Sequence, residues 1–335
     1  MEWYVVSPYF ETADDRWISH AVAGDRHRFI LIPRLGADRN WHQSTARAGM
    51  GEWFNRFRQA ARAFAEPEAG VITVFPQLAA AAGGWKLARR DDRPLVSWMF
   101  NTEAINEGLN RWAARPMLDR VDRFVVHSRA EVAHYANILR MPAERFEYVP
   151  LQYGAAVETE RPDGQTEPYV FATGTGYRDY ETFFAAMTKL GYRTLVLASE
   201  RALAGLTIPP NVEILDQISR PEIRRFVRHA RVNVVPLRDG AVTAGLVTIV
   251  ETFRHGRSLV ITDRPGLEDY CIEGETALFA GLFDPGSMAE AIDHMWSDTG
   301  ARRRLDAGAA AFADANCTDE VAARHLVRIL DSVSS

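Results

Sequence analysis

The sequence contains little cysteine, with two residues in 335, Cys271 and Cys317. These two are far apart and lack the spacing of metal ligands, so the sequence predicts no disulfide scaffold or metal site and favours a reducing compartment. No stretch approaches the ~20 consecutive apolar residues that a membrane-spanning helix needs. The N-terminal residues MEWYVVSPYFETADD lack a basic segment and a long apolar core. We therefore expect a first β-strand there rather than a signal peptide.

The chain also lacks an excess of positive charge. It has 39 Lys and Arg residues against 44 Asp and Glu residues, which gives a net charge of -5 at pH 7. A general nucleic-acid binder usually has a basic surface, so we expect no nucleic-acid partner. Hydrophobic residues make up 47% of the chain and charged residues 25%, which is typical of a soluble globular protein. The length is enough for two domains of ordinary size.

Short apolar runs alternate with helical patterns along the chain. In the first part, strands are predicted at residues 3–6, 28–32, 70–75, 94–100 and 123–127, and helices at residues 51–64, 102–118 and 130–139. A polar stretch at residues 157–168 is the predicted interdomain linker, and a second alternating series begins at Tyr169. This alternation predicts an α/β fold with parallel sheets covered on both faces. Ligands then bind beyond the carboxyl ends of the strands.

The segment at residues 240–279 is the most informative part of the chain. It opens with the small-residue turn Thr243-Ala244-Gly245, and a short apolar helix with a single acid, Glu251, follows. Such a turn leaves backbone N–H groups free at the positive end of the helix dipole, which suits a phosphate or diphosphate. The acid lies about one and a half turns into the helix, where it could accept hydrogen bonds from ribose hydroxyls. The segment predicts a nucleotide-sugar site rather than a dinucleotide site.

Four segments, in this order, resemble the group 1 family of GT-B glycosyltransferases, the glycogen-synthase-like retaining enzymes. They are FVVHSRAEVAHYANILRMPAERFEYVPLQYG, FATGTGYRDYETFFAAM, NVEILDQISRPEIRRFVRHARVNVVPLRDG and the segment at residues 240–279. Each segment alone is weak evidence for the family, and the resemblance rests on the order and spacing of all four. The resemblance runs from about residue 123 to the C-terminus, whereas the first 120 residues share only a general pattern with the family.

The resemblance implies two Rossmann-like domains facing a cleft, the GT-B fold. It assigns residues 1–157 to an acceptor-binding domain, 158–168 to a linker and 169–317 to a nucleotide-sugar-binding domain. Residues 318–335 are expected to form a C-terminal helix that crosses back to the first domain. The family generally works without a bound metal. We therefore expect no metal and no cofactor, and we interpret Asp91-Asp92 as part of a charged turn.

In the family, the second acid of a Glu-x7-Glu motif holds the donor ribose, and Glu251 stands at that position. Its apolar neighbours argue against the alternative, a solvated helix glutamate, because an idle buried acid is costly. The first acid of the motif is replaced here by Thr243, so the backbone amides that follow would meet the diphosphate, helped by the hydroxyl of Thr243 or Thr248. The implied donor-binding residues in this segment are Thr243, Ala244, Gly245, Leu246, Val247 and Glu251.

A second part of the donor site is expected in the loop after the first strand of the second domain, which contains Gly174, Thr175, Gly176 and Arg178. Arg178 stands where the family has a lysine, whose role is to neutralise charge on the leaving nucleoside diphosphate. Thr175 stands where the family usually has an arginine. The alternative for Arg178 is an ordinary surface arginine on a tight turn.

The first domain offers weaker candidates. Asn101 ends a predicted strand where the family often has a histidine that faces the donor sugar. An amide can bond sugar hydroxyls but cannot act as a base, so Glu103 could serve instead, and helix capping is the alternative for Asn101. His42, in a polar loop, is predicted to contact the acceptor. The helix at residues 51–64 has an apolar stripe beside arginines, and such a helix lies on an anionic membrane or, more commonly, packs on its own sheet.

These features predict a glycosyltransferase that moves a hexose-type sugar from a UDP- or GDP-sugar to a glycan or lipid-linked glycan acceptor. Retention of the anomeric configuration is implied by the resemblance. Two alternatives stay open: a non-catalytic nucleotide-sugar-binding subunit of a transferase complex, and a nucleotide-sugar epimerase of the same fold. We expect a cytoplasmic protein, either free or peripheral at the inner face of the membrane.

Overall fold

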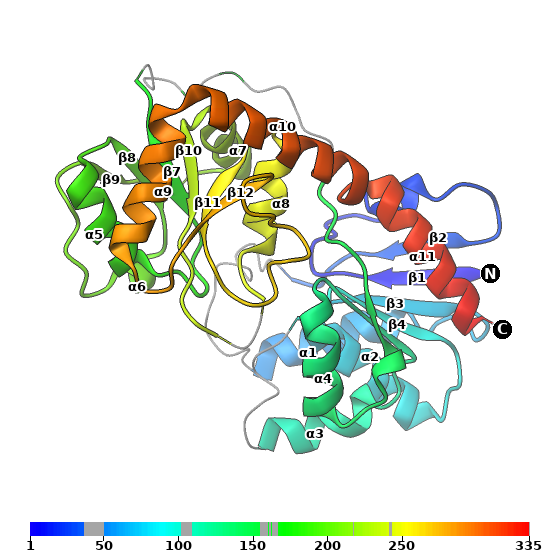
Figure 1. Cartoon of the computed structure of the whole chain (residues 1–335). Coiled ribbons are helices and arrows are strands. Elements are labelled where there is room, and N and C mark those ends of the chain that lie inside the picture. Colours follow the sequence, from blue (N-terminus) through cyan, green and yellow to red (C-terminus); the bar gives the residue numbers. More distant parts are fainter. Residues whose placement is uncertain are drawn as a thin grey trace. The chain divides into compact units, whose positions relative to one another are not determined.

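Two six-stranded parallel sheets organise the described part of the chain in this computed structural model (Figure 1). The structure describes residues 1–36, 50–101, 109–154, 160, 162, 167–216, 218–240 and 243–334. Two compact units contain one sheet each, and they are formed by residues 1–149 with 322–335 and by residues 150–321. The linker predicted at residues 158–168 lies largely outside the described residues.

The first unit has a sheet in the order β2-β1-β3-β4-β5-β6. Its strands are β1 (Glu2–Val6), β2 (Arg28–Ile32), β3 (Gly70–Val74), β4 (Leu95–Trp98), β5 (Arg123–Val126) and β6 (Phe146–Tyr148). The helices are η1 (Ile18–Ala21), α1 (Met50–Arg62), α2 (Pro76–Arg89), α3 (Leu109–Leu118), α4 (Arg129–Leu139), η3 (Ala143–Arg145) and most of α11 (Asp319–Val333). Every residue of β3 and β4 is buried, because helices cover both faces of the sheet.

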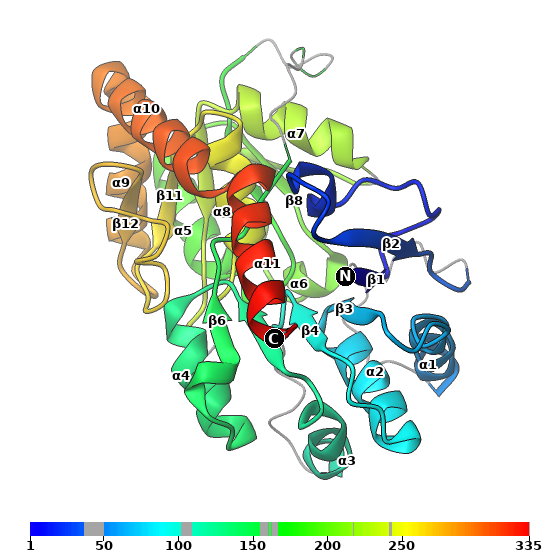
Figure 2. The same cartoon turned by 90° about the vertical axis from the view of Figure 1, so that its right-hand side faces the viewer.

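The last helix, α11, packs on the sheet of the first unit. Its residues Ala322, Leu326 and Ile329 share a buried cluster with Trp3 of β1 and Trp98 of β4. These apolar residues are three or four positions apart, so they lie on one face of the helix. Figure 2 shows α11 against that face of the sheet. The predicted C-terminal helix on the first unit is confirmed.

The second unit has a sheet in the order β12-β11-β10-β7-β8-β9. Its strands are β7 (Val170–Thr173), β8 (Thr194–Leu197), β9 (Val212–Ile214), β10 (Val232–Val235), β11 (Leu259–Thr262) and β12 (Ala277–Ala280). Its helices are α5 (Tyr180–Leu190), α6 (Glu200–Leu203), α7 (Arg220–His229), α8 (Leu246–Arg254), α9 (Pro285–Ser297) and α10 (Thr299–Asn316). The strand order runs one way from β7 and the other way from β10, which is the doubly wound Rossmann order.

Alternating side chains of β7 and the residue before it fill both cores of the second unit. Val170 and Ala172 belong to a cluster with residues of α5 and α9, whereas Tyr169 and Phe171 belong to a cluster with Phe226 of α7. This is the period-2 pattern of a strand buried on both faces. The α/β class predicted from the sequence is confirmed.

One helix of the first unit was missing from the prediction. In α2, Pro76 follows a strand and the pair Gly83-Gly84 looks like a break, but proline is favourable in the first turn of a helix. Gly83 is needed for packing, because a Cβ there would lie 1.9 Å from the carbonyl oxygen of Met117 in α3. Close approach of two helices therefore explains residues that resemble a loop in the sequence.

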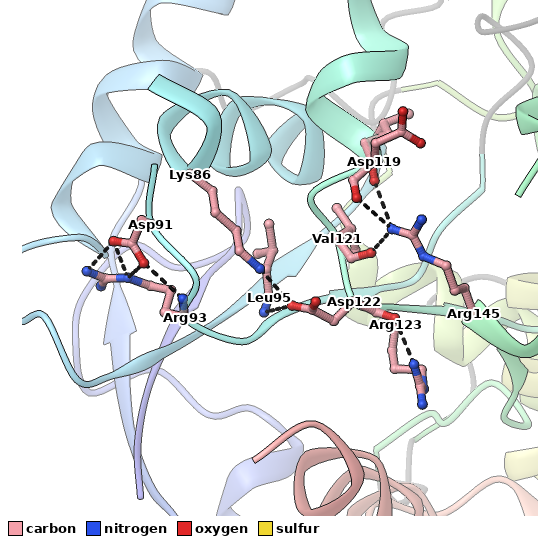
Figure 3. Close-up of polar contacts among 10 residues, drawn as sticks. Lys86, Asp91, Arg93, Leu95, Asp119, Val121, Asp122, Arg123 and Arg145 are labelled. Carbon is pink, nitrogen blue, oxygen red and sulfur yellow. Dashed lines mark hydrogen bonds and ion pairs between the residues drawn. The ribbon is translucent and has the colours of Figure 1, made fainter. Parts of the chain in front are cut away.

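Charged side chains at the amino end of the first sheet bind one another (Figure 3). Arg93 donates through Nε to both carboxylate oxygens of Asp91, at 2.9 and 2.8 Å. Lys86 Nζ lies 2.9 Å from Asp122 Oδ2, which also accepts from the backbone N–H of Leu95 at 2.7 Å. These bonds fix the turns that enter the strands, and they engage Asp91 in an ion pair within its own turn.

Candidate functional site

Three loops lie at one edge of the sheet in the second unit. They follow β7, β10 and β11, and their described residues are 174–179, 236–240 with 243–245, and 263–268. Because all strands of this sheet are parallel, their carboxyl ends meet at the same edge. The strand order reverses between β7 and β10, and open α/β sheets bind ligands at such a reversal. This edge is the candidate functional site.

Gly174 provides the space that Arg178 occupies. The glycine has a φ of 122°, and a Cβ at this position would lie 2.4 Å from Nη2 of Arg178. Any larger residue would displace the guanidinium. The hydroxyl of Tyr180 donates to the carbonyl oxygen of Gly174 at 2.7 Å and fixes the loop to the start of α5. The glycine-rich loop thus packs against the side chain of Arg178, and the lack of a side chain at Gly174 makes this contact possible.

The guanidinium of Arg178 is buried, with 7% of the residue exposed. It donates to the carbonyl oxygens of Thr173 and Gly176, at 3.1 and 2.9 Å, and to Oγ1 of Thr248 at 3.1 Å. These acceptors are all neutral, and no carboxylate in the described part of the chain forms an ion pair with Arg178. Burial lowers the pKa of this guanidinium. A buried cation without a counter-charge is costly, so an anion bound beside it would be stabilised.

The N-terminus of α8 lies next to this guanidinium. Gly245, the N-cap, has a φ of 85°, and among the described residues no side chain caps the first turn. The first N–H groups of a helix have no intrahelical partner and carry partial positive charge. Thr248 of that turn accepts the hydrogen bond from Arg178, and a Cβ on Gly245 would lie 3.8 Å from Nη1 of the same arginine. Two independent cationic groups therefore converge, as an anion-binding site requires.

A second buried arginine at this edge was missing from the sequence prediction. Arg264, in the loop after β11, is 4% exposed and donates to the carbonyl oxygens of Arg238 and Gly240, at 2.9 and 2.5 Å. Burial lowers the pKa of Arg264, and the charge of Asp239 acts in the opposite direction. The sequence RPG indicated only a turn at this point, because nothing local shows that the arginine folds back onto the loop after β10.

Glu251 is held by two residues that the sequence prediction also missed. The hydroxyl of Tyr153 donates to Oε1 of Glu251 at 2.5 Å, and Nε of Arg224 in α7 lies 3.8 Å from the same oxygen. Arg224 also donates to the hydroxyl of Tyr153 at 3.2 Å. Burial raises the pKa of Glu251, while the hydrogen bond from Tyr153 and the charge of Arg224 oppose that shift. Burial and the neighbouring Glu251 raise the pKa of Tyr153 to about 12.

The other predicted site residues fall into two groups. Thr175 is half-buried in the β7 loop, and Val247 is 54% exposed in the first turn of α8, so both lie at the candidate site. Asn101 belongs to the first unit, where it is exposed just after Phe100. Glu103 and His42 lie outside the described residues, and their predicted roles stay predictions.

The chemistry available at this edge is the binding of an anion and of a polyol. Arg178, Arg264 and the N-terminus of α8 supply positive charge, while Glu251 supplies a hydrogen-bond acceptor in the same helix. Within the residues that the structure describes, no group of three or more His, Cys, Asp or Glu side chains is placed to hold a metal ion. Gly245 and Leu246, predicted to meet the anion, lie at the N-terminus of α8, and a Cβ on Gly245 would lie 3.8 Å from Nη1 of Arg178.

Comparison with known proteins points to one family. Residues 177–298 match the sequence model of the family described as "Glycosyl transferases group 1". This match covers the loops after β10 and β11, the second half of the loop after β7 and all of α8. A search of curated proteins finds no significant match.

Several solved structures share the fold over nearly the whole chain. Anabaena Alr3699/HepE in complex with UDP-glucose is similar with a TM-score of 0.73 and 12% identity, covering 99% of this chain and 100% of that one. A glycosyltransferase from Rickettsia africae has a TM-score of 0.67 and 12% identity, covering 99% and 98%. Sucrose-phosphate synthase from Thermosynechococcus elongatus has a TM-score of 0.67 and 16% identity, covering 98% and 88%. At such identities the likeness concerns the fold.

Proposed function

The chain belongs to the group 1 glycosyl transferases of the GT-B fold, and we propose that it moves a hexose-type sugar from a UDP- or GDP-sugar to a glycan or lipid-linked glycan acceptor. We further propose that the reaction retains the anomeric configuration. The observation that carries this proposal is the buried Arg178, whose hydrogen-bond partners within the described residues are all neutral and which adjoins the N-terminus of α8.

Arg178 and the N-terminus of α8 would bind the diphosphate of the donor. A guanidinium has five N–H donors, and three of its hydrogen bonds here go to neutral oxygens, so donors remain for a phosphate oxygen. Negative charge grows on the nucleoside diphosphate as the bond to the sugar breaks. A positive charge that is already fixed in a buried position stabilises that change without further rearrangement. Because these groups take up the charge, we propose that no metal ion or cofactor is needed.

Glu251 would hold the ribose of the donor. The contacts from Tyr153 and Arg224 both reach Oε1, so they fix the carboxylate and leave Oε2 to accept from ribose hydroxyls. A carboxylate that is already oriented loses little freedom when the nucleotide binds. Anabaena Alr3699/HepE was solved in complex with UDP-glucose, so UDP-glucose is the first donor to test.

The acceptor side rests on fewer observations. We propose that Asn101 or Glu103 contacts the donor sugar and that His42 contacts the acceptor, as the family resemblance implies. Thr243, which stands in place of the first acid of the family motif, specifically favours a second candidate function: a subunit that binds the nucleotide sugar for a partner transferase without turning it over.

Contact with the membrane would be limited to a small surface of α1. Trp53 and Phe57 pack against the core of the first unit, whereas Phe54 is 62% exposed with the guanidinium of Arg58 5.7 Å from its ring. One exposed aromatic beside a cation supports a weak, peripheral contact, such as a lipid-linked acceptor would require. Among the described residues, no helix is both long and apolar enough to span a bilayer. We propose that the protein is cytoplasmic and binds reversibly at the inner face of the membrane.

A donor panel tests the proposed function. UDP-glucose, UDP-galactose, GDP-mannose and the free nucleoside diphosphates would be added to the full chain, and the midpoint of thermal unfolding would be measured. At least one nucleotide sugar should raise the midpoint and release its nucleoside diphosphate when a membrane extract supplies acceptors. Binding without release would favour the binding subunit, and epimerised donor without acceptor would favour an epimerase. If no donor binds, the proposal is wrong.

A further inference from the structure

A cavity of about 440 Å³ lies at the opposite edge of the sheet in the second unit. Two of the residues that line it come just before strands of that sheet: Arg231 directly before β10, and Arg257 shortly before β11. The loops of the candidate donor site follow these same strands. A four-residue strand spans roughly 13 Å, so the two sites are separated by the full height of the sheet. The cavity therefore does not belong to the donor site.

The lining of this cavity is strongly cationic. The arginines in it are Arg228, Arg231, Arg257, Arg302 and Arg303, and the only acid in the lining is Asp306. Asp306 is already engaged, because Oδ2 lies 3.0 Å from Nη1 of Arg257 and Oδ1 accepts from the N–H and hydroxyl of Ser258, both at 2.7 Å. One carboxylate thus pairs with one arginine, and the lining contains five arginines against this one acid.

Several of these arginines are held in place by carbonyl oxygens at helix ends. Arg231 donates to the carbonyl oxygen of Trp296 through Nε at 2.8 Å and Nη2 at 2.6 Å, and Arg302 donates to that of Met295 at 2.8 Å. Both carbonyls are in the last turn of α9, where the helix dipole is negative. The cations are therefore positioned by neutral groups, at a helix end that offsets only part of their charge.

Arg303 differs from the others. It is exposed on α10 and makes no hydrogen bond or ion pair within the described residues, so it has no structural partner to explain its place in the lining. Crowding of like charges is also visible in Arg302. Burial lowers the pKa of Arg302, and the neighbouring Arg231, Arg257 and Arg303 lower it further, while Asp306 opposes them. An anion in the cavity would relieve this repulsion.

We propose that this arginine pocket, lined by Arg228, Arg231, Arg257, Arg302 and Arg303, binds the phosphate monoester or diphosphate group of a small phosphorylated molecule. The planar guanidinium matches two phosphate oxygens at once, which makes arginine the preferred residue for this recognition. The volume falls in the range of small-molecule sites and exceeds what a single phosphate needs. Because the pocket and the donor site lie at opposite edges, both can be occupied at once.

Calorimetric titration of the full chain with inorganic pyrophosphate tests the pocket, with UDP in excess so that the donor site is occupied. Arg303→Glu should weaken pyrophosphate binding at least about tenfold, because a charged hydrogen bond is lost and a repulsive charge is added. Arg304→Glu is the matched control: Arg304 is an exposed neighbour on the same helix outside the lining. It should change affinity by less than about threefold, as expected for a screened surface charge. Within the described part of the chain, neither Arg303 nor Arg304 makes a hydrogen bond or ion pair, so both variants should unfold at the wild-type temperature.

A third variant separates this site from the donor site. Arg178→Gln should leave pyrophosphate binding in the presence of UDP unchanged. Loss of binding in Arg178→Gln but not in Arg303→Glu would overturn the proposal, as would equal effects of Arg303→Glu and Arg304→Glu.

The phosphate group could come from a soluble metabolite or from a lipid headgroup, and two further probes distinguish these sources. Glucose 6-phosphate would be titrated in solution, and vesicles of phosphatidylcholine with phosphatidic acid would be tested by flotation. Binding of either probe that depends on Arg303 and not on Arg304 supports the proposal and identifies the source. If pyrophosphate and both of these probes fail to bind in an Arg303-dependent way, the pocket is not a phosphate site.

Discussion

The hydroxyl of Tyr153 donates a 2.5 Å hydrogen bond to Oε1 of Glu251, across 98 residues of sequence. The tyrosine comes from the segment before β7, and the acid comes from α8. This bond ties the start of the second unit to the helix whose N-terminus faces Arg178. It gives Glu251 a fixed orientation, which an exposed helix glutamate would lack.

Replacement of Tyr153 tests whether that orientation matters for the nucleotide. Tyr153→Phe keeps the ring and removes one hydrogen bond to a charged group, so we expect nucleoside affinity to fall by about threefold to tenfold. Isothermal titration with the nucleoside of the best donor would measure it. Tyr192→Phe is the control, because Tyr192 makes a similar 2.5 Å bond to Asp293 at an exposed place away from the site. If Tyr153→Phe and the wild type bind the nucleoside with equal affinity, Glu251 does not need the hydrogen bond from Tyr153 for nucleoside binding.

The glycines of the β7 loop provide a matched pair of variants. Gly174→Ala should displace Arg178, because the new Cβ would lie 2.4 Å from Nη2 at a φ of 122°. We expect a stability loss of about 1–3 kcal/mol and weaker binding of the nucleoside diphosphate. Gly176→Ala is two residues away and its Cβ would meet nothing within 4 Å, so it should behave as the wild type. Chemical denaturation and titration calorimetry would check both, and a harmless Gly174→Ala would contradict the described packing.

Stability should depend on pH through two buried histidines. Burial lowers the pKa of His127 and of His255 to about 4 from the usual 6.5, and nearby arginines add to the shift of His255. Between about pH 4 and 6.5 the unfolded chain therefore binds protons that the folded chain does not. Stability should fall as the pH drops through this window, by up to about 3 kcal/mol for each histidine.

Thermal unfolding midpoints at pH 7, 5.5 and 4.5 would measure this dependence. His255→Phe should make the dependence shallower, because it removes a group that titrates differently in the folded and unfolded chain. Among the described residues, neither ring nitrogen of His255 has a hydrogen-bond partner that the substitution would remove. His294→Phe, at an exposed position of α9, should leave the slope unchanged. If the unfolding midpoint of His255→Phe depends on pH more steeply than that of the wild type, the attribution of this pH dependence to His255 is wrong.

The fold could be predicted from the sequence because buried parallel strands are short, apolar and separated by helices. Each predicted strand of the first unit matches an observed one, with ends that differ by a few residues, as for β4, predicted at residues 94–100 and observed at Leu95–Trp98. The helix α2 could not be predicted, because Gly83 serves a contact with Met117 that only the folded structure reveals. Local pattern determines the elements, and tertiary packing explains the exceptions.

The candidate site was predictable only in part. Arg178 and Gly245 each follow a strand, so the parallel topology brings them to one edge, and the small-residue turn indicated an open helix N-terminus. Arg224 and Arg264 were missed for a physical reason. Each acts through a long side chain that reaches another segment, and a helix arginine or a turn arginine gives no local sign of where its guanidinium lies.

The role of Arg178 can be measured by comparing a nucleoside diphosphate with its nucleoside. Titrations of UDP and uridine, or of GDP and guanosine if the panel favours them, would be made with the wild type, Arg178→Gln and the exposed control Arg304→Gln. If Arg178 binds the diphosphate, Arg178→Gln lowers the affinity for the nucleoside diphosphate by about tenfold to a hundredfold. The affinity for the nucleoside then stays within about twofold of the wild-type value. If Arg178→Gln binds the diphosphate as tightly as the control does, the loops after β7 and β10 do not form the donor site.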